Sequence, residues 1–144
     1  MILVDESATV KLGAQLAKAL RPGDVIALSG PLGVGKTALV RAMIGALGHE
    51  GEVPSPSFAI VQPYEDLSPV IWHVDLYRIE STDELAELGL DSLTDTVLLV
   101  EWPERAGEDG WPNALRLGLE FADGTSRRLT ADVPPSWQGR WPVQ

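Results

Sequence analysis

The sequence contains no cysteine and only two histidines, which limits the metal and redox chemistry open to it. Without thiols the chain has neither a disulfide framework nor a thiolate metal site. The two histidines, His49 and His73, are too few for a typical zinc site. The composition therefore argues against a transition-metal centre.

Long apolar runs and basic residues are also scarce. No uninterrupted apolar run approaches the roughly 18 residues that a membrane span needs. Residues 1–6 lack the basic and apolar segments of a signal peptide, so we expect a cytoplasmic protein with no membrane partner. Eleven basic residues against 21 acidic ones give a net charge of −10. This charge disfavours direct binding to nucleic acid and favours basic protein partners.

The most informative motif is residues 30–37, GPLGVGKT, which match the phosphate-binding pattern G-x-x-x-x-G-K-[ST]. The apolar run Val25–Leu28 before it predicts a buried parallel strand. Residues 36–47 contain no proline and precede Gly48, which predicts a helix that ends there. Strand, loop and helix follow in the order that phosphate binding requires. We therefore predict that the chain binds a nucleoside triphosphate.

Glycines in this loop let backbone N–H groups approach phosphate closely, and the start of the helix adds partial positive charge. Lys36 would bridge the β- and γ-phosphates, and Thr37 would ligate Mg²⁺. The overlapping pattern G-x-G-x-x-[GA] at residues 33–38 would instead suit a dinucleotide. That fold needs an acid at a strand end about 20 residues later, but Glu50 and Glu52 lie in a predicted loop. The predicted nucleotide-binding residues of the loop are Gly33, Val34, Gly35, Lys36, Thr37 and Ala38.

The remaining pattern predicts a single α/β domain over residues 1–133, with a P-loop NTPase-like fold. We expect a mixed, largely parallel central sheet flanked by helices, followed by a C-terminal antiparallel hairpin. Residues 134–144 form a tail rich in proline and tryptophan, in which Trp137 and Trp141 are expected to dock on the domain. The predicted elements are a helix from Asp5 or Ser7 to residues 21–23, strands at 57–62, 70–77 and 97–100, a helix from the capping box 81–84 to Glu87, and hairpin strands at 115–121 and 127–133 around Asp123-Gly124.

Glu101 directly follows the apolar strand at residues 97–100, so it is expected at the carboxyl edge of the sheet. Ligands of open α/β sheets bind at that edge. Glu101 could hold Mg²⁺, directly or through water, or orient the attacking water. The alternative is an ordinary acid at the end of a strand.

Residues 72–78, WHVDLYR, form a second acidic candidate. Strand alternation places His73, Asp75 and Tyr77 on one face and the apolar residues on the other. Asp75 could bind or position water near the γ-phosphate, and the alternative is a buried aspartate paired with Arg78 or His73. We interpret His73 as a hydrogen-bonded structural histidine.

Residues 54–58, PSPSF, combine two prolines with the hydroxyls of Ser55 and Ser57. This composition suits a switch that senses Mg²⁺ and γ-phosphate. A plain proline-rich connection is the alternative.

Four motifs together resemble the TsaE family: GxLGxGKT at 30–37, SPSF at 55–58, HVDLYR at 73–78 and VEWPE at 100–104. The resemblance spans nearly the whole chain. It implies a small bacterial P-loop ATPase of tRNA threonylcarbamoyladenosine synthesis with ATP and Mg²⁺ as cofactors. It also implies TsaD and TsaB as partners, the pair that transfers the threonylcarbamoyl group to an adenosine beside the anticodon. With a net charge of −10, the protein alone is expected to bind tRNA poorly.

The resemblance also implies roles for single residues. Lys36, Asp75 and Glu101 would be catalytic, and Thr37 and Glu101 would serve Mg²⁺. The nucleotide would also be contacted by Thr9, Ser57, Trp102 and Arg128. Two positions depart from the family pattern: Pro31 replaces an aspartate and removes an N–H, and Ser57 replaces a threonine.

Three other classes stay open. A metabolite or nucleotide kinase would need a second pocket and an arginine-rich lid, and Arg105 stands largely alone in its segment. A GTP switch would need an Asn-Lys-x-Asp motif, but the single asparagine, Asn113, precedes Ala114. A regulatory subunit that binds ATP without hydrolysing it would share the phosphate loop.

Overall fold

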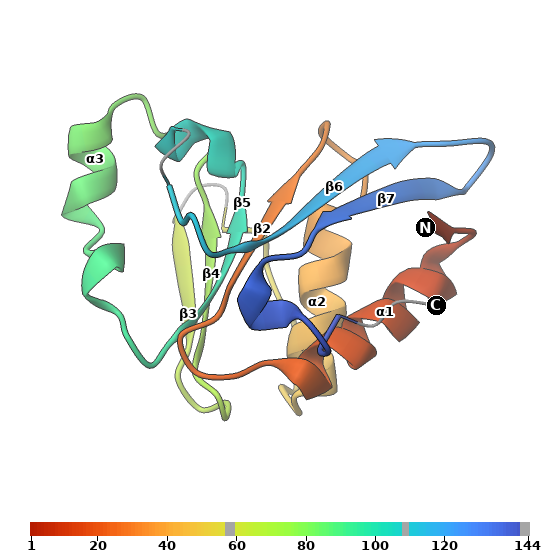
Figure 1. Ribbon diagram of the computed structural model, residues 1–144, viewed down its shortest axis with the longest axis horizontal. Helices are drawn as coiled ribbons and strands as arrows, with labels where there is room; N and C mark the ends of the chain where they lie inside the picture. The colour runs from red at the N-terminus through yellow and green to blue at the C-terminus, as the bar shows by residue number, and fades with distance from the viewer. Residues whose placement is uncertain (57–59, 108–109, 142–144) are drawn as a thin grey trace.

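The computed structural model describes residues 1–56, 60–107 and 110–141. In these ranges the strands form one sheet in the order β1-β7-β6-β2-β5-β4-β3 (Figure 1). The strands are β1 (Ile2–Leu3), β2 (Val25–Ser29), β3 (Val61–Tyr64), β4 (Ile71–Asp75), β5 (Val97–Glu101), β6 (Leu115–Phe121) and β7 (Arg127–Asp132). The α-helices are α1 (Glu6–Ala19), α2 (Lys36–Ala46) and α3 (Thr82–Glu87), and short 3₁₀ helices cover Leu90–Ser92, Pro103–Ala106 and Pro135–Trp137.

The four central strands β6, β2, β5 and β4 are mutually parallel, while β3, β7 and β1 join the sheet antiparallel. The predicted mixed sheet with a C-terminal antiparallel hairpin is therefore confirmed. Leu28 pairs with Glu101, and Glu101 pairs with Asp75 on the next strand. This register brings the ends of three strands to one edge, where the phosphate loop also begins.

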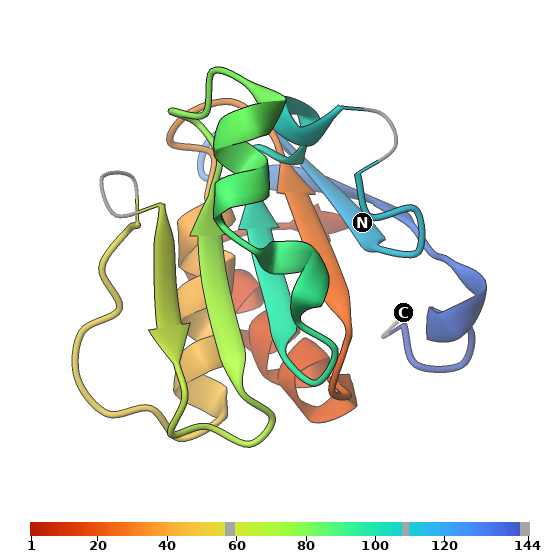
Figure 2. The same cartoon turned by 90° about the vertical axis from the view of Figure 1, so that its left-hand side faces the viewer.

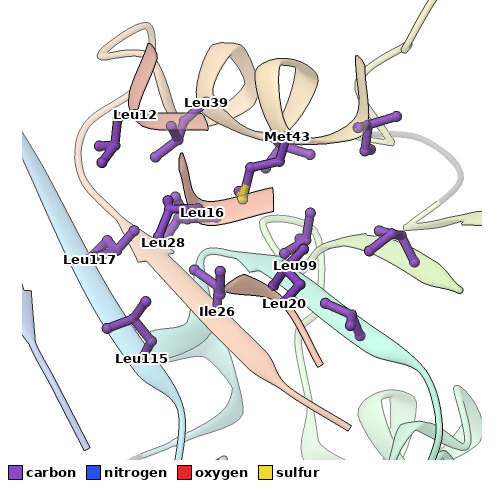
Figure 3. Close-up of a cluster of buried hydrophobic side chains, with 14 of the residues drawn as sticks. Leu12, Leu16, Leu20, Ile26, Leu28, Leu39, Met43, Leu99, Leu115 and Leu117 are labelled. Carbon is purple, nitrogen blue, oxygen red and sulfur yellow. The ribbon is translucent and has the colours of Figure 1, made fainter. Parts of the chain in front are cut away.

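Helices cover both faces of the sheet. Figure 2 shows α3 in front of the strands and α1 and α2 behind them. Helix α1 is capped by Asp5, one of the two predicted caps, whose side chain accepts a hydrogen bond of 3.0 Å from the N–H of Ala8. The main core lies between α1, α2 and the sheet (Figure 3), and it includes Leu12, Leu16, Leu20, Ile26, Leu28, Leu39, Met43, Leu99, Leu115 and Leu117. A second apolar cluster under α3 contains Val74, Leu76, Ile79, Leu90, Leu98 and Val100.

Some strand boundaries differ from the prediction. Residues 57–59 lie outside the described residues, and Ile60 has a φ of 69°, so the strand predicted at 57–62 begins only at Val61. It continues through Pro63 because β3 is an edge strand, where a missing N–H is tolerated. The strand predicted at 70–77 ends at Asp75. Strand β1, which the sequence analysis missed, is only two residues long.

The segment after β7 packs on the domain. Trp137 is 1% exposed and belongs to the main core, and the partly buried Trp141 packs against it, so the expected docking of both rings is confirmed. Arg140 forms two hydrogen bonds to the Asp24 carboxylate, at 2.7 and 3.0 Å. The longest α-helix in the described part of the chain has 14 residues, and none there has the length and apolar character of a transmembrane span.

Candidate functional site

The phosphate loop, residues 30–37, connects the end of β2 to the start of α2. Gly35 is the residue before the helix and has a φ of 119°, a value that favours glycine. Gly30 has a φ of 142°, and a Cβ there would lie 2.5 Å from the carbonyl oxygen of Leu119. Both glycines are therefore required by the backbone path of the loop.

A pocket of about 230 Å³ opens beside this loop. It is concave and lined by polar and charged groups from four separate segments of the chain, which the sheet register brings together. The lining residues are Leu32, Gly33, Gly35, Lys36, Thr37, Ala38, Ser55, Asp75, Glu101 and Trp102.

Lys36 is buried and turned back over its own loop. Its ammonium group donates to the carbonyl oxygen of Gly30 and lies 3.8 Å from the centre of the Trp102 ring. Burial lowers the pKa of Lys36, while the nearby carboxylates of Glu101, Glu104 and Asp75 act in the opposite direction. The site thus holds a desolvated cation next to a cluster of acids.

Thr37 and Glu101, which line the pocket, form a hydrogen-bonded array with the buried His73. The Thr37 hydroxyl lies 3.0 Å from Glu101 Oε1 and 2.9 Å from Oε2. His73 Nε2 lies 2.6 Å from the same Oε2. Both Glu101 and His73 are buried, with exposed fractions of 3% and 0%. A buried carboxylate needs such donors, and His73 is hydrogen-bonded, as the sequence analysis expected.

A hydroxyl and a carboxylate in contact suit Mg²⁺, which prefers oxygen ligands and usually takes only one or two from the protein, with phosphates and water supplying the rest. Within the described ranges, no group of three or more His, Cys, Asp or Glu side chains is placed to hold a metal by itself. The donors Thr37 and Glu101 therefore fit a cation that arrives with a phosphate ligand better than a resident structural ion.

Asp75 is buried at the end of β4, beside Glu101 in the sheet register. One carboxylate oxygen accepts a hydrogen bond of 2.9 Å from the N–H of Tyr77, which turns the chain after the strand. The expected separation of faces is also present, because Val74 and Leu76 pack in the cluster under α3. Asp75 is thus an acid on the pocket wall, a location that would suit a group that accepts a hydrogen bond from water.

Trp102 follows Glu101 with a φ of 59°, which is uncommon for a large side chain. Its ring lies over Lys36 and also packs against Tyr77, with 4.9 Å between ring centres. The unusual backbone conformation directs the chain out of the strand and places an aromatic wall beside the phosphate loop.

The structure does not bring every predicted residue to this pocket. Thr9 and Arg128 do not line it, and the exposed Arg128 side chain lies 3.7 Å from Glu120 on the neighbouring strand. The Val34 side chain packs in the core, although its backbone belongs to the loop. Ser57 lies outside the described residues, whereas its neighbour Ser55 lines the pocket.

Arg127 is a functional candidate that the sequence analysis missed. Its Nε donates a hydrogen bond of 2.9 Å to the carbonyl oxygen of Val34, and its guanidinium lies 4.7 Å from the centre of the Phe121 ring. Consecutive arginines in a strand point to opposite faces, so the pattern alone cannot tell which of Arg127 and Arg128 faces the loop.

A larger cavity of about 450 Å³ lies between α3 with the residues that follow it, on one side, and Ala106 with residues 110–112, on the other. None of its lining side chains within the described residues is ionisable. Of these two pockets, the smaller one at the phosphate loop is lined by ionisable side chains, namely Lys36, Asp75 and Glu101.

Comparison with known proteins gives a consistent result. The family model described as threonylcarbamoyl adenosine biosynthesis protein TsaE matches residues 3–129. The chain is 45% identical to the tRNA threonylcarbamoyladenosine biosynthesis protein TsaE of Streptomyces coelicolor, over 91% of this chain and 92% of that protein. It is 42% identical to the protein of the same name from Mycobacterium tuberculosis, over 84% of this chain and 78% of the relative.

The fold has a solved counterpart. The crystal structure of YdiB from Bacillus subtilis superimposes with a TM-score of 0.78 at 27% sequence identity, covering 97% of this chain and 88% of that one. The sheet order and helix positions described above are therefore those of an experimentally observed fold.

Proposed function

The chain belongs to the TsaE family, and on that premise we propose that it binds and hydrolyses ATP in tRNA threonylcarbamoyladenosine biosynthesis. It would act in the cytoplasm with the TsaB–TsaD pair, the transferase that modifies adenosine next to the anticodon. One observation carries the ATPase part of this proposal: Lys36, Thr37 and Glu101 meet in one pocket at the phosphate loop.

The roles follow from the chemistry of each group. Backbone N–H groups of the loop and the Lys36 ammonium would neutralise phosphate charge. Thr37 and Glu101 would hold Mg²⁺, which supplies further positive charge at the phosphates when bound. Asp75 would accept a hydrogen bond from the attacking water and so orient it toward the γ-phosphate. The products would be ADP and phosphate.

Several sequence features support ATP and protein partners over the alternatives. The chain has no Asn-Lys-x-Asp motif for guanine, so we expect ATP to be preferred over GTP. With a net charge of −10, the surface repels phosphate backbones, and the tRNA would be bound chiefly by the partners. Hydrolysis by the protein alone is expected to be slow, because it would lack the partner surface that completes or orders the segment 54–58 around the γ-phosphate.

The proposal is tested by measuring steady-state ATP hydrolysis with and without the TsaB–TsaD pair. Wild type should be stimulated by the pair, Lys36→Ala should lose hydrolysis and most Mg-ATP affinity, and Glu101→Gln should stay folded but inactive. The affinity for the pair should also differ between an ATP analogue, ADP and no nucleotide, because linkage is reciprocal for binding. Unstimulated turnover together with nucleotide-independent assembly would contradict the proposal.

A further inference from the structure

His73 is fully buried on β4, and its ring reaches the carboxylate of Glu101 on the adjacent strand. The distance between Nε2 and Oε2 is 2.6 Å. In the described structure the other ring nitrogen, Nδ1, is also buried and has no hydrogen-bond partner. Within the described residues, the ring of His73 therefore has its hydrogen bond to Glu101 alone.

The different surroundings of Nε2 and Nδ1 determine which of the two nitrogens carries the proton. An ionised carboxylate only accepts, so Nε2 must carry the proton and donate it to Glu101. A proton on Nδ1 would be a buried donor without an acceptor, which folded proteins avoid more strictly than an unpaired acceptor. The geometry thus favours the tautomer with Nε2–H and a lone pair on Nδ1.

Glu101 is held from two sides by this arrangement. The Thr37 hydroxyl from α2 contacts both carboxylate oxygens, and His73 from β4 contacts Oε2. A neutral N–H donor holds the carboxylate in place and leaves its negative charge uncancelled. A lysine or arginine at this position would cancel that charge. Histidine therefore supplies orientation and leaves the charge available to a cation.

We propose that His73 is the positioning residue of the Mg²⁺ site: it orients the Glu101 carboxylate toward Thr37 so that the two side chains can bind the cation together. This inference rests on the proposed function, because it assigns a role at the same nucleotide site. His73 touches neither nucleotide nor metal in this proposal and acts through Glu101. Groups that orient metal ligands in this way typically change metal affinity by about 10- to 100-fold when they are removed.

Two substitutions distinguish the effect of the N–H donor of His73 from the effect of the size of its ring. His73→Phe keeps an aromatic ring in the buried space but removes the N–H donor. His73→Gln places an amide N–H near the position of Nε2. His49→Phe alters the other histidine, whose ring contacts Tyr64 and the carbonyl oxygen of Glu52 rather than Glu101, and serves as the matched control.

The affinity for ADP is then measured by calorimetry in EDTA and over a series of Mg²⁺ concentrations. We expect His73→Phe to bind metal-free ADP within about twofold of wild type but to need at least about 10-fold more Mg²⁺ for the metal-dependent gain. His73→Gln should restore most of that gain, and His49→Phe should behave as wild type. An unchanged Mg²⁺ dependence in His73→Phe, or an equal loss in His73→Gln, would overturn the inference.

A second measurement needs neither nucleotide nor a substituted His73. The chain has two histidines, so nitrogen-15 imidazole spectra are simple, and the His49→Phe variant assigns the His73 signals. The Nε2–H tautomer supports the inference, and the Nδ1–H tautomer overturns it. If wild type binds no ADP, the proposed function fails. The tautomer spectrum then still shows whether Nε2 of His73 donates the hydrogen bond to Glu101.

Discussion

Arg127 Nε donates a hydrogen bond of 2.9 Å to the carbonyl oxygen of Val34, which lies 93 residues earlier in the chain. This contact ties the C-terminal hairpin to the phosphate loop. The guanidinium also donates to the carbonyl oxygen of Ser126 and lies over the Phe121 ring, so its orientation is fixed. The last strand thus stabilises the loop that would bind phosphate.

We predict that Arg127→Ala weakens Mg-ATP binding about 10-fold, which corresponds to about 1.4 kcal/mol, because the loop loses a charge-assisted hydrogen bond. Calorimetric titration measures the change. The comparison variant is Arg128→Ala, which removes the exposed neighbour that the sequence analysis placed near the nucleotide. A larger loss in Arg128→Ala than in Arg127→Ala would restore that sequence-based assignment.

The relation of these two arginines shows where sequence reasoning ends. The loop, its strand and its helix were predictable because the glycine pattern, the apolar run and the absence of proline are local signals. The position of Glu101 at the sheet edge followed from the same local logic. Which arginine faces the loop depends on the register of β7 against β6, which local patterns do not determine.

The hydrogen bond between His73 and Glu101 was unpredictable for the same reason. The two residues are 28 positions apart, and their contact depends on the parallel pairing of β4 with β5. Alternation correctly placed His73 and Asp75 on one face, but it did not identify Glu101 as the partner of His73. The start of β3 was wrong because the positive φ of Ile60 is a tertiary feature.

A second prediction concerns the contact between α1 and α2. A Cβ on Gly13 would lie 2.4 Å from the Cβ of Ala42, so Gly13→Ala should lower the free energy of unfolding by about 1–3 kcal/mol through overpacking. Gly45→Ala is the matched control, since no atom lies within 4 Å of its added Cβ, and it should raise stability by about 0.5–1 kcal/mol. Urea unfolding measures both, and equal stability of the two variants would contradict the close packing.

A third prediction follows from the buried Lys36. Burial lowers the pKa of Lys36 below the ordinary 10.5. At pH values between the lowered pKa and 10.5, the unfolded chain therefore binds more protons than the folded one. The free energy of unfolding of wild type should therefore rise with pH in that window, relative to Lys36→Met. Urea unfolding of both proteins at a series of alkaline pH values measures the difference, and a difference that falls as pH rises would show that the pKa of Lys36 is not lowered.

The last prediction uses the contact between Lys36 and Trp102. Because the ammonium group lies 3.8 Å from the ring centre, its attraction by phosphate should change the environment and fluorescence of Trp102. Titration of wild type with Mg-ADP should give a saturable fluorescence change that Trp102→Phe lacks. Trp72→Phe should keep the change, since Trp102 lines the pocket at the phosphate loop and Trp72 does not. A full signal in Trp102→Phe would mean that the change arises at another of the five tryptophans and would contradict the prediction.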